Sequence, residues 1–380
     1  MTRAGRWRLL LLLSLNACTT SAPPSAPVPQ LPPHDVALTL YLIGDAGDPN
    51  PAGEPVLRSL DQQLAAGGKA QVVVFLGDNI YPKGLPLPGA PERSEAERRI
   101  DAQLQVIAKA GATGYFVLGN HDWARFGKDG WDAVLRQDAY VDSAGRGHTV
   151  LLPSGGCPGP SVVDIAPSVR LVLLDTQWWL HSGPKPVGPS SRCDAAADDQ
   201  IVDSIRTAIG TAQGRLVVVA GHHPVATGGL HGGYFGWKDH IFPLTNIEPW
   251  LWLPLPLIGS LYPAARQNGI SNQDMGSVAY QHFISVMTRA FAAKTPALYA
   301  AGHDHNLQVI AGGPAKLQLV SGGGIYEHTE RATAIRGTLF AHQASGFGRL
   351  DVTASGQARL AVLEVNGAGE SHEVFSTWVE

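Results

Sequence analysis

Five short motifs hold most of the metal-binding residue types of this chain, and each follows a short apolar run. They are Gly-Asp-Ala-Gly at 44–47, Gly-Asp-Asn-Ile-Tyr at 77–81, Gly-Asn-His-Asp at 119–122, Gly-His-His at 221–223 and Gly-His-Asp-His at 302–305. Such runs, when they end in glycine, are typical of buried strands. Ligands of α/β sheets bind beyond the carboxyl ends of the strands, so we expect one cluster of carboxylates, an amide, imidazoles and a phenol.

The chemistry of this cluster follows from its ligand types. Two aspartates, one asparagine, three histidines and a tyrosine are too many ligands for one ion, and they suit two ions that share a carboxylate. Two metals about 3.5–4 Å apart can hold the attacking and leaving oxygens of a displacement at phosphorus. The motifs therefore predict a phosphoester hydrolase.

The phenol is the ligand that best discriminates between metals. Phenolate is hard and anionic, which favours Fe(III), whereas imidazole and amide oxygen suit a divalent Zn, Fe or Mn ion. A trivalent ion acidifies its bound water more strongly than a divalent ion does. We therefore expect a hydroxide nucleophile that is already present below neutral pH.

In this order the five motifs resemble those of the metallophosphoesterases, also called calcineurin-like phosphoesterases. Tyr81 is similar to the tyrosine of the purple acid phosphatase branch, and the segments 77–81 and 302–308 resemble the small, tartrate-resistant type. The resemblance covers residues 36–325. It implies an α/β fold, the four-layer α-β-β-α sandwich, in which two packed mixed sheets have helices on their outer faces.

Carried over residue by residue, the resemblance implies a binuclear centre in which Asp78 bridges the two ions. The implied Fe(III) ligands are Asp45, Asp78, Tyr81 and His305. The implied ligands of the divalent ion are Asp78, Asn120, His222 and His303. The first motif has Gly47 where most metallophosphoesterases have a ligating histidine, and within the purple branch Tyr81 takes that place.

Three further histidines receive roles from the same resemblance. His121 is expected to hold the phosphate or to protonate the leaving oxygen, and His231 is expected to assist it. His223 stands where the small enzymes usually have a tyrosine, so it is expected to reshape the substrate pocket. Asp122 and Asp304 are expected to orient imidazoles rather than to bind metal. The other histidines are expected to be structural or at the surface: His34, His148, His181, His240, His282, His328, His342 and His372.

The amino terminus predicts export. Arg3, Arg6 and Arg8 precede a leucine-rich stretch that is too short to span a bilayer, and Cys18 follows it. This pattern resembles a bacterial lipoprotein signal in which Cys18 is lipidated; the alternative is an ordinary cleaved signal peptide. We expect a signal peptide at 1–17, a Pro/Ser-rich tether at 18–35 and a catalytic domain at 36–380. The protein would then be a membrane-anchored lipoprotein facing the periplasm or the cell surface.

The two remaining cysteines suggest one disulfide bond. Cys157 and Cys193 form an even pair in a chain predicted to be exported. The alternative is two free thiols, because sequence alone does not fix the distance between them.

The composition is that of an enzyme core. The chain has 380 residues, of which 44% are hydrophobic and 16% charged, so one large α/β domain or two smaller ones are possible. The net charge of -4 and the absence of a Lys/Arg block argue against a nucleic-acid binder. We expect a small phosphorylated substrate, a membrane contact through the lipid anchor and no obligate protein partner.

The sequence also predicts the helices and strands that position the motifs. Apolar spacing and a following glycine predict helices at 56–66, 92–110 and 198–209. Further strands are expected at 169–174, 316–320, 347–353, 357–365 and 372–379. An insertion at about 232–281 contains the apolar stretch 250–262, in which Pro254 and Pro256 exclude an ordinary helix. That stretch is either a lid or membrane-facing lip, or a loop whose apolar residues pack on the domain; we favour the packed loop.

The most consistent interpretation is an exported, lipid-anchored acid phosphatase in which a metal-bound hydroxide attacks phosphate monoesters. A phosphodiesterase that acts on nucleotides or lipid head groups with the same metals is one alternative. A surface lipoprotein that binds a ligand without catalysis is the other. The motifs specify the metals and leave the identity of the leaving group open.

Overall fold

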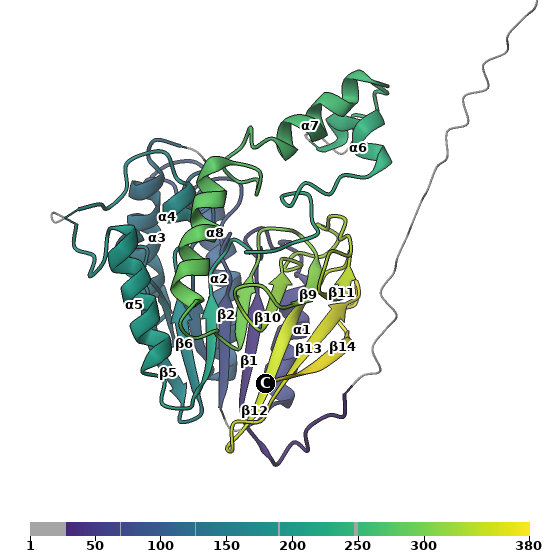
Figure 1. Ribbon diagram of the computed structural model, residues 1–380. Helices are drawn as coiled ribbons and strands as arrows, with labels where there is room; N and C mark the ends of the chain where they lie inside the picture. Colours follow the sequence, from purple (N-terminus) through teal and green to yellow (C-terminus); the bar gives the residue numbers. More distant parts are fainter. Residues whose placement is uncertain (1–27, 69, 126, 189–190, 247–249) are drawn as a thin grey trace, which may run out of the picture.

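A computed structural model describes residues 28–380 apart from residues 69, 126, 189–190 and 247–249. The predicted signal peptide, Cys18 and most of the predicted tether lie outside the described residues. In the described part, the chain folds into two seven-stranded sheets with helices on their outer sides (Figure 1). No helix of this part is long and apolar enough to cross a membrane.

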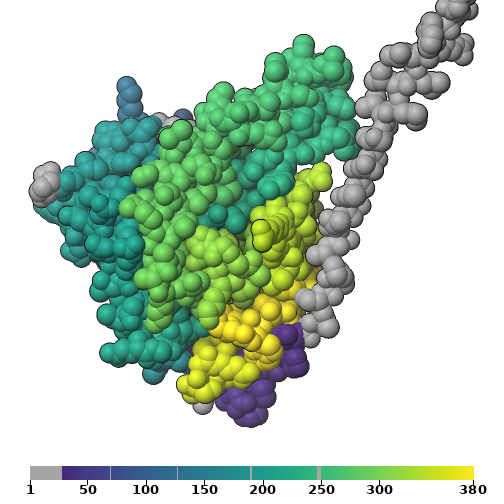
Figure 2. Space-filling view, in the orientation of Figure 1, coloured from purple at the N-terminus to yellow at the C-terminus, as the bar shows by residue number. Residues whose placement is uncertain are grey.

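The first sheet joins amino-terminal and carboxyl-terminal parts of the chain. Its strand order is β14-β13-β12-β1-β2-β3-β4. Parallel pairing links β1 (Val36–Ile43), β2 (Gln71–Phe75), β3 (Thr113–Phe116) and β4 (Thr149–Leu151). Antiparallel pairing adds β12 (Gly346–Thr353), β13 (Ala358–Val365) and β14 (Ser371–Val379). The backbone oxygen of Val28 accepts a hydrogen bond of 3.0 Å from Arg359, so residues 28–35 run beside the last strands (Figures 1 and 2).

The second sheet has the order β11-β9-β10-β8-β7-β6-β5. Its parallel centre consists of β6 (Val169–Leu173), β7 (Leu216–Ala220), β8 (Leu298–Ala301) and β10 (Leu317–Ser321). Its antiparallel edges are β5 (Ser161–Ala166), β9 (Leu307–Ala311) and β11 (Thr338–His342). Each sheet is therefore mixed, with the motif-bearing strands in its parallel part.

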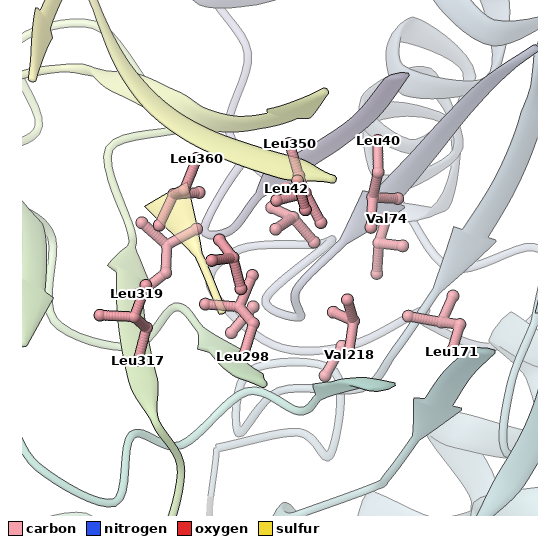
Figure 3. Packing of buried hydrophobic residues seen from close by; sticks show 14 of the residues in the cluster. Leu40, Leu42, Val74, Leu171, Val218, Leu298, Leu317, Leu319, Leu350 and Leu360 are labelled. Atoms are coloured by element: carbon pink, nitrogen blue, oxygen red, sulfur yellow. The ribbon is translucent and has the colours of Figure 1, made fainter. Parts of the chain in front are cut away.

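The two sheets pack face to face through alternating aliphatic side chains. Leu40, Leu42 and Val74 of the first sheet face Val218 and Leu298 of the second, and all five are buried (Figure 3). Successive side chains of a strand point to opposite faces, so the residues between these belong to the outer faces of the sheets.

Helices cover both outer faces. The first sheet carries α1 (Pro55–Ala66), α2 (Arg93–Ala110) and α3 (Gly130–Ala144). The second carries α4 (Gln177–Leu180), α5 (Asp198–Gly210) and α8 (Val278–Phe291). The order of layers is therefore α-β-β-α, and the predicted fold class is confirmed. The helices predicted at 56–66, 92–110 and 198–209 are present within one residue at each end, whereas α3 and α8 were not predicted.

The insertion forms an arm that projects beyond the strand ends (Figures 1 and 2). It contains α6 (Trp237–Ile241), the short 3-10 turns η2 (Pro243–Asn246) and η3 (Ile258–Ser260), and α7 (Leu261–Gln267). Trp250 is 72% exposed, Leu257 90% and Leu261 68%. The prediction that the apolar residues of 250–262 pack on the domain is therefore wrong.

Cys157 and Cys193 form a disulfide bond in the structure. The bond joins the loop after η1 (Ser154–Gly156) to the irregular stretch before α5. The two cysteines are 36 positions apart, and the described residues between α4 and Cys193 form no helix or strand.

Candidate metal centre

The five motifs meet because their strands end at the same edge of the two packed sheets. The motifs follow β1, β2 and β3 in the first sheet and β7 and β8 in the second. The sheets approach closely here: Gly44 N donates to Ser321 O at 2.8 Å. A Cβ atom on Gly44 would lie 2.9 Å from the Cα of Gly302, so both positions require glycine.

Asn120, His222 and His303 form the first group of converging donor atoms. Asn120 Oδ1 lies 3.1 Å from His222 Nε2 and 3.1 Å from His303 Nδ1, and the two nitrogens are 3.2 Å apart. The other ring nitrogens face backbone oxygens, at 2.9 Å for His222 Nδ1 and Leu76 O, and at 3.0 Å for His303 Nε2 and Gln273 O. Since a carbonyl oxygen can only accept, those outer nitrogens carry the ring hydrogens.

This arrangement fits a metal ion. With the outer nitrogens protonated, the three inner atoms have at most one hydrogen between them. Burial lowers the pKa of His222, but Asp78 outweighs burial and raises that pKa to about 9, so without metal the His222 Nε2 carries this proton. A metal ion can replace the proton as the cation at this place. Metal–ligand bonds of about 2.0–2.1 Å place two ligands of one ion about 3.0–3.4 Å apart, which matches the three observed separations. The residues present therefore suit a divalent ion at this place.

Asp45, Tyr81 and His305 form the second group. The Tyr81 hydroxyl lies 3.1 Å from Asp45 Oδ1 and 3.1 Å from His305 Nε2, and the last two atoms are 3.4 Å apart. Without metal, the hydroxyl can donate to Asp45 Oδ1 and accept from a protonated His305 Nε2, and a metal ion would replace these two protons. Burial, together with Asp45 and Asp78, holds the pKa of Tyr81 well above its ordinary value, so an anionic phenolate here needs a strongly charged cation.

Asp78 stands between the two groups. Asp78 Oδ2 lies 3.4 Å from His222 Nε2, and ligand atoms of Asp45, Asp78 and His222 lie within 4.8 Å of one another. Burial raises the pKa of this carboxyl, but His222 and His121 outweigh burial and hold the pKa below its usual range. Asp78 is therefore anionic and placed to contact both groups, as a bridging ligand must be.

Three of these residues have left-handed backbone. The φ angles are 60° for Asp45, 53° for Asp78 and 71° for His303. Left-handed backbone is uncommon outside glycine and costs energy, although aspartate and histidine adopt it more often than most residues. Asp45 Oδ2 accepts from His303 N at 2.8 Å and Asp78 Oδ1 accepts from His121 N at 2.8 Å. These hydrogen bonds join neighbouring motifs and stabilise their left-handed backbone.

His121 lies at the open side of this cluster. Its Nδ1 donates to Pro82 O at 2.7 Å, its Nε2 is 3.9 Å from Asp78 Oδ2, and its ring centroid is 4.3 Å from that of Tyr81. Burial lowers the pKa of His121, and the Asp78 carboxylate opposes this only in part. Among the described residues its Nε2 makes no hydrogen bond, and the nearest carboxylate is that of Asp78, a predicted ligand.

His231 lies beside the first group. Its ring centroid is 3.9 Å from that of His303, and its Nδ1 is 3.0 Å from Asp274 Oδ1. Burial lowers the pKa of His231, but the hydrogen bond to Asp274 outweighs burial and leaves the pKa raised. Arg266 makes two hydrogen bonds of 2.6 Å to the same carboxylate.

His223 lies behind His303 and is fully buried. Its Nδ1 is 2.8 Å from Thr176 Oγ1 and its Nε2 is 2.8 Å from Gln273 Oε1. Ligand atoms of His222, His223 and His303 could surround an ion, but the nitrogens of His223 are already engaged, so Asn120 is the better third ligand. The role of His223 in the substrate pocket stays a prediction.

The carboxylates of Asp122 and Asp304 accept hydrogen bonds from loop residues rather than from imidazole rings. Asp122 accepts from Gly119 N at 2.8 Å and from Asn79 N at 3.0 Å, which joins the second and third motifs. Asp304 accepts from Thr227 Oγ1 at 2.6 Å and from His231 N at 3.1 Å. Burial and the nearby Asp78 charge raise the pKa of Asp122 to about 7. Among the described residues neither carboxylate bonds an imidazole ring, so the expected ring-orienting role is wrong.

Sequence reasoning missed several residues that support the cluster. Gln273 and Asp274 come from the return of the arm, and their sequence context has no glycine-ended strand to mark them. His328, expected to be a structural or surface residue, lies with its ring centroid 4.4 Å from that of His305. Burial and the His305 charge lower the pKa of His328 to about 4. No spacing rule links these positions to the five motifs.

Comparisons with known proteins concern the family and the fold of this chain. A family model described as calcineurin-like phosphoesterase matches residues 38–307, which is more than half of the chain. No curated protein matches the chain.

Several solved structures align with most of this chain, and those with a TM-score above 0.5 share its fold. PhoD aligns at 15% identity over 94% of this chain and 71% of its own, with a TM-score of 0.52. GAP50, the anchor in the inner membrane complex of Plasmodium, aligns at 13% identity over 90% and 88%, with a TM-score of 0.51. The purple acid phosphatase PPD1 of yellow lupin (Lupinus luteus) aligns at 12% identity over 89% and 53%, with a TM-score of 0.49. Identities this low show similarity of fold alone.

Proposed function

The chain belongs to the calcineurin-like phosphoesterase family, and on that premise we propose that it is an acid phosphatase that hydrolyses phosphate monoesters at a binuclear metal centre. The observation that carries the proposal is the pair of adjacent donor groups with Asp78 between them. The phenol of Tyr81 in the second group supports Fe(III) there, and the imidazoles and amide of the first support divalent Fe, Zn or Mn. Two bound cations supply neutralisation of the phosphate and acidification of water.

The protein's own residues supply the proton. With Nδ1 donating to Pro82 O, His121 can donate from Nε2 only as an imidazolium. Because burial lowers its pKa, that form is present in acid and is lost as the pH rises. His231, whose Nδ1 is held by Asp274, is the second histidine available to the leaving oxygen. Both features support an optimum below neutral pH and a bell-shaped profile that belongs to the coupled site.

A doubly charged monoester is favoured because two cations neutralise it better than a singly charged diester. The test is metal content, visible absorption and turnover of one monoester and one diester, on protein purified without chelator. We expect two ions, at least one of them iron, and faster monoester hydrolysis. A preference for diesters, or an optimum above about pH 8 where a histidine acid is deprotonated, would instead support a phosphodiesterase. Two bound ions without turnover would support a binding protein.

Tyr81→Phe is the variant that tests the iron assignment. A phenolate on Fe(III) gives a broad visible charge-transfer band, and this substitution removes the phenol oxygen while it keeps the ring against His121. We expect the band to disappear while the circular dichroism spectrum is unchanged. A band of undiminished intensity in Tyr81→Phe would show that the colour, if any, has another source.

We also propose that the enzyme is exported and held at a membrane through Cys18. The short leucine-rich stretch before Cys18 and the Pro-rich sequence after it support this location. Cys18→Ala is expected to prevent lipidation and to leave the protein unprocessed or soluble. Membrane fractionation and mass analysis of the amino-terminal peptide measure this. An unmodified mature terminus at another residue of the wild-type protein would contradict the lipoprotein assignment.

A further inference from the structure

The arm ends in an exposed apolar tip, which we call the lip and define as residues 250–262. This segment contains no charged residue. Trp250, Trp252, Leu253, Leu257, Ile258 and Leu261 are all more than half exposed. Soluble proteins seldom expose so many large apolar side chains together, and such patches mark sites of interaction.

The lip is an ordered element held by the rest of the arm. Leu255 N donates to Ile241 O at 2.7 Å, Gly259 N donates to Leu255 O, and the Trp252 ring packs 5.3 Å from Phe242. Pro254 and Pro256 have no N–H group to satisfy. Several backbone N–H groups of the lip are therefore either hydrogen-bonded within the arm or replaced by proline. An apolar environment requires this, because it offers unpaired N–H groups no water.

Leu257, the most exposed residue of the lip, has strained backbone. Its φ of 69° and ψ of -56° lie close to the rare, strained form of the γ-turn, and Ile258 N donates to Pro256 O at 2.9 Å across it. This turn directs a leucine into solvent at an energetic cost. Strain of this kind persists where function requires it.

The base of the arm contacts the metal centre. Met275 N donates to His231 O at 2.8 Å, and Gln273 O accepts from His303 Nε2 at 3.0 Å. Arg266 of α7 is bonded to Asp274, which in turn holds His231. The same arm therefore carries the apolar tip at one end and supports the first donor group at the other.

We propose that the lip inserts into a lipid bilayer and presents the metal centre to phosphate monoesters carried by lipids in that bilayer. A convex, uncharged tip rich in tryptophan, leucine and proline fits a fluid apolar medium better than a rigid protein partner. Tryptophan with a nearby cation is typical of the membrane interface, and Lys238 Nζ lies 4.5 Å from the Trp252 ring centroid. The proposal that lipid phosphate monoesters are the substrate depends on the proposed phosphatase activity. The proposal that the lip inserts into a bilayer does not depend on that activity.

The sequence before the described residues suits this placement. Val28, where Arg359 holds the chain, lies ten residue steps after Cys18, and such a segment reaches at most about 35 Å when extended. A lipid on Cys18 would keep the domain near a bilayer without orienting it, because Val28 lies beside β13 and β14 and the lip lies beyond the opposite strand ends (Figure 1). A second contact through the lip would fix which face meets the lipids.

Insertion is measured by tryptophan fluorescence of the full chain reconstituted into phosphatidylcholine vesicles that contain brominated lipid. We expect quenching in the wild type and its loss in Trp250→Phe/Trp252→Phe. Trp378→Phe on β14, the same substitution far from the lip, should retain it. If the wild type is not quenched, or the lip variant is quenched equally, the proposal is wrong. If light scattering shows that the wild type is a dimer and the lip variant a monomer, the lip binds a second copy of the chain and the proposal is also wrong.

Substrate presentation is measured by hydrolysis of phosphatidic acid in the same vesicles and of soluble glycerol phosphate. Leu257→Ser/Ile258→Ser should lower the rate on vesicles about 10-fold or more and leave the soluble rate unchanged, since membrane binding scales with inserted apolar area. Leu87→Ser/Val278→Ser removes equally exposed residues elsewhere and should change neither rate. Equal effects of the two double variants would contradict the proposal that the lip brings the metal centre to the membrane. Absence of any hydrolysis with quenching intact would instead contradict the proposed function.

Discussion

Asp78→Asn is expected to release metal and to abolish turnover while the fold survives. Asp78 is the carboxylate placed between the two donor groups, so its substitution removes a negative charge that both ions would share. We expect a loss of at least ~100-fold in metal affinity, because even groups that only orient ligands contribute 10–100-fold. Asparagine tolerates the left-handed backbone of this position, where φ is 53°, and can still accept from His121 N.

The measurements are metal stoichiometry after dialysis, turnover, and thermal unfolding of the dialysed protein. Asp48→Asn is the matched control, because Asp48 is another aspartate near the first motif but its carboxylate is half exposed and pairs with Arg99 at 2.7 Å. The control should keep both ions and full turnover. Two tightly bound ions in Asp78→Asn, or equal losses in both variants, would show that Asp78 does not bridge metals.

The parts of the site that sequence predicts are those governed by strand ends. A glycine-ended apolar run tells where a strand stops, and parallel strands stop at the same edge of a sheet, so the motifs alone predict that Asp45, Asp78 and Asn120 lie together. The structure brings them within one cluster with His222 and His303. The two-sheet sandwich was expected from the family resemblance, and it is confirmed.

The sequence could not predict the contacts made by the residues that follow the arm. Gln273 and Asp274 reach His303 and His231 only because a long excursion comes back over the strand ends, and no periodicity encodes that return. The missed helix α3 buries Val134 and Val141, but its start has no side-chain cap hydrogen bond that would signal it. The lip was misjudged because the rule that apolar residues pack inside is statistical, and Leu257 is an exception to it.

His121→Ala is expected to lower turnover by about 10²–10⁴-fold, which is the usual contribution of a positioned acid or hydrogen-bond donor. Metal content should stay at the wild-type value, because none of the close donor-atom separations in the two groups involves the His121 ring. His222→Ala, by contrast, removes one corner of the first donor triangle and should lose the divalent ion as well as activity. Metal analysis and turnover of the two variants, side by side, distinguish a residue that acts on substrate from one that holds metal.

The pH dependence decides whether His121 acts as the acid. Since burial lowers its pKa and its Nδ1 hydrogen is committed to Pro82, only the protonated ring can donate from Nε2, and this contribution falls as the pH rises. In His121→Ala the alkaline limb of the kcat/KM profile should therefore flatten, and alkyl phosphates should suffer more than esters with good leaving groups such as nitrophenol. A uniform loss at every pH and for every leaving group would mean that His121 positions the phosphate without transferring a proton. A parallel loss of metal would mean that the ring supports the ligand loops, since His121 Nδ1 donates to Pro82 O beside Tyr81 and this bond is lost in the variant.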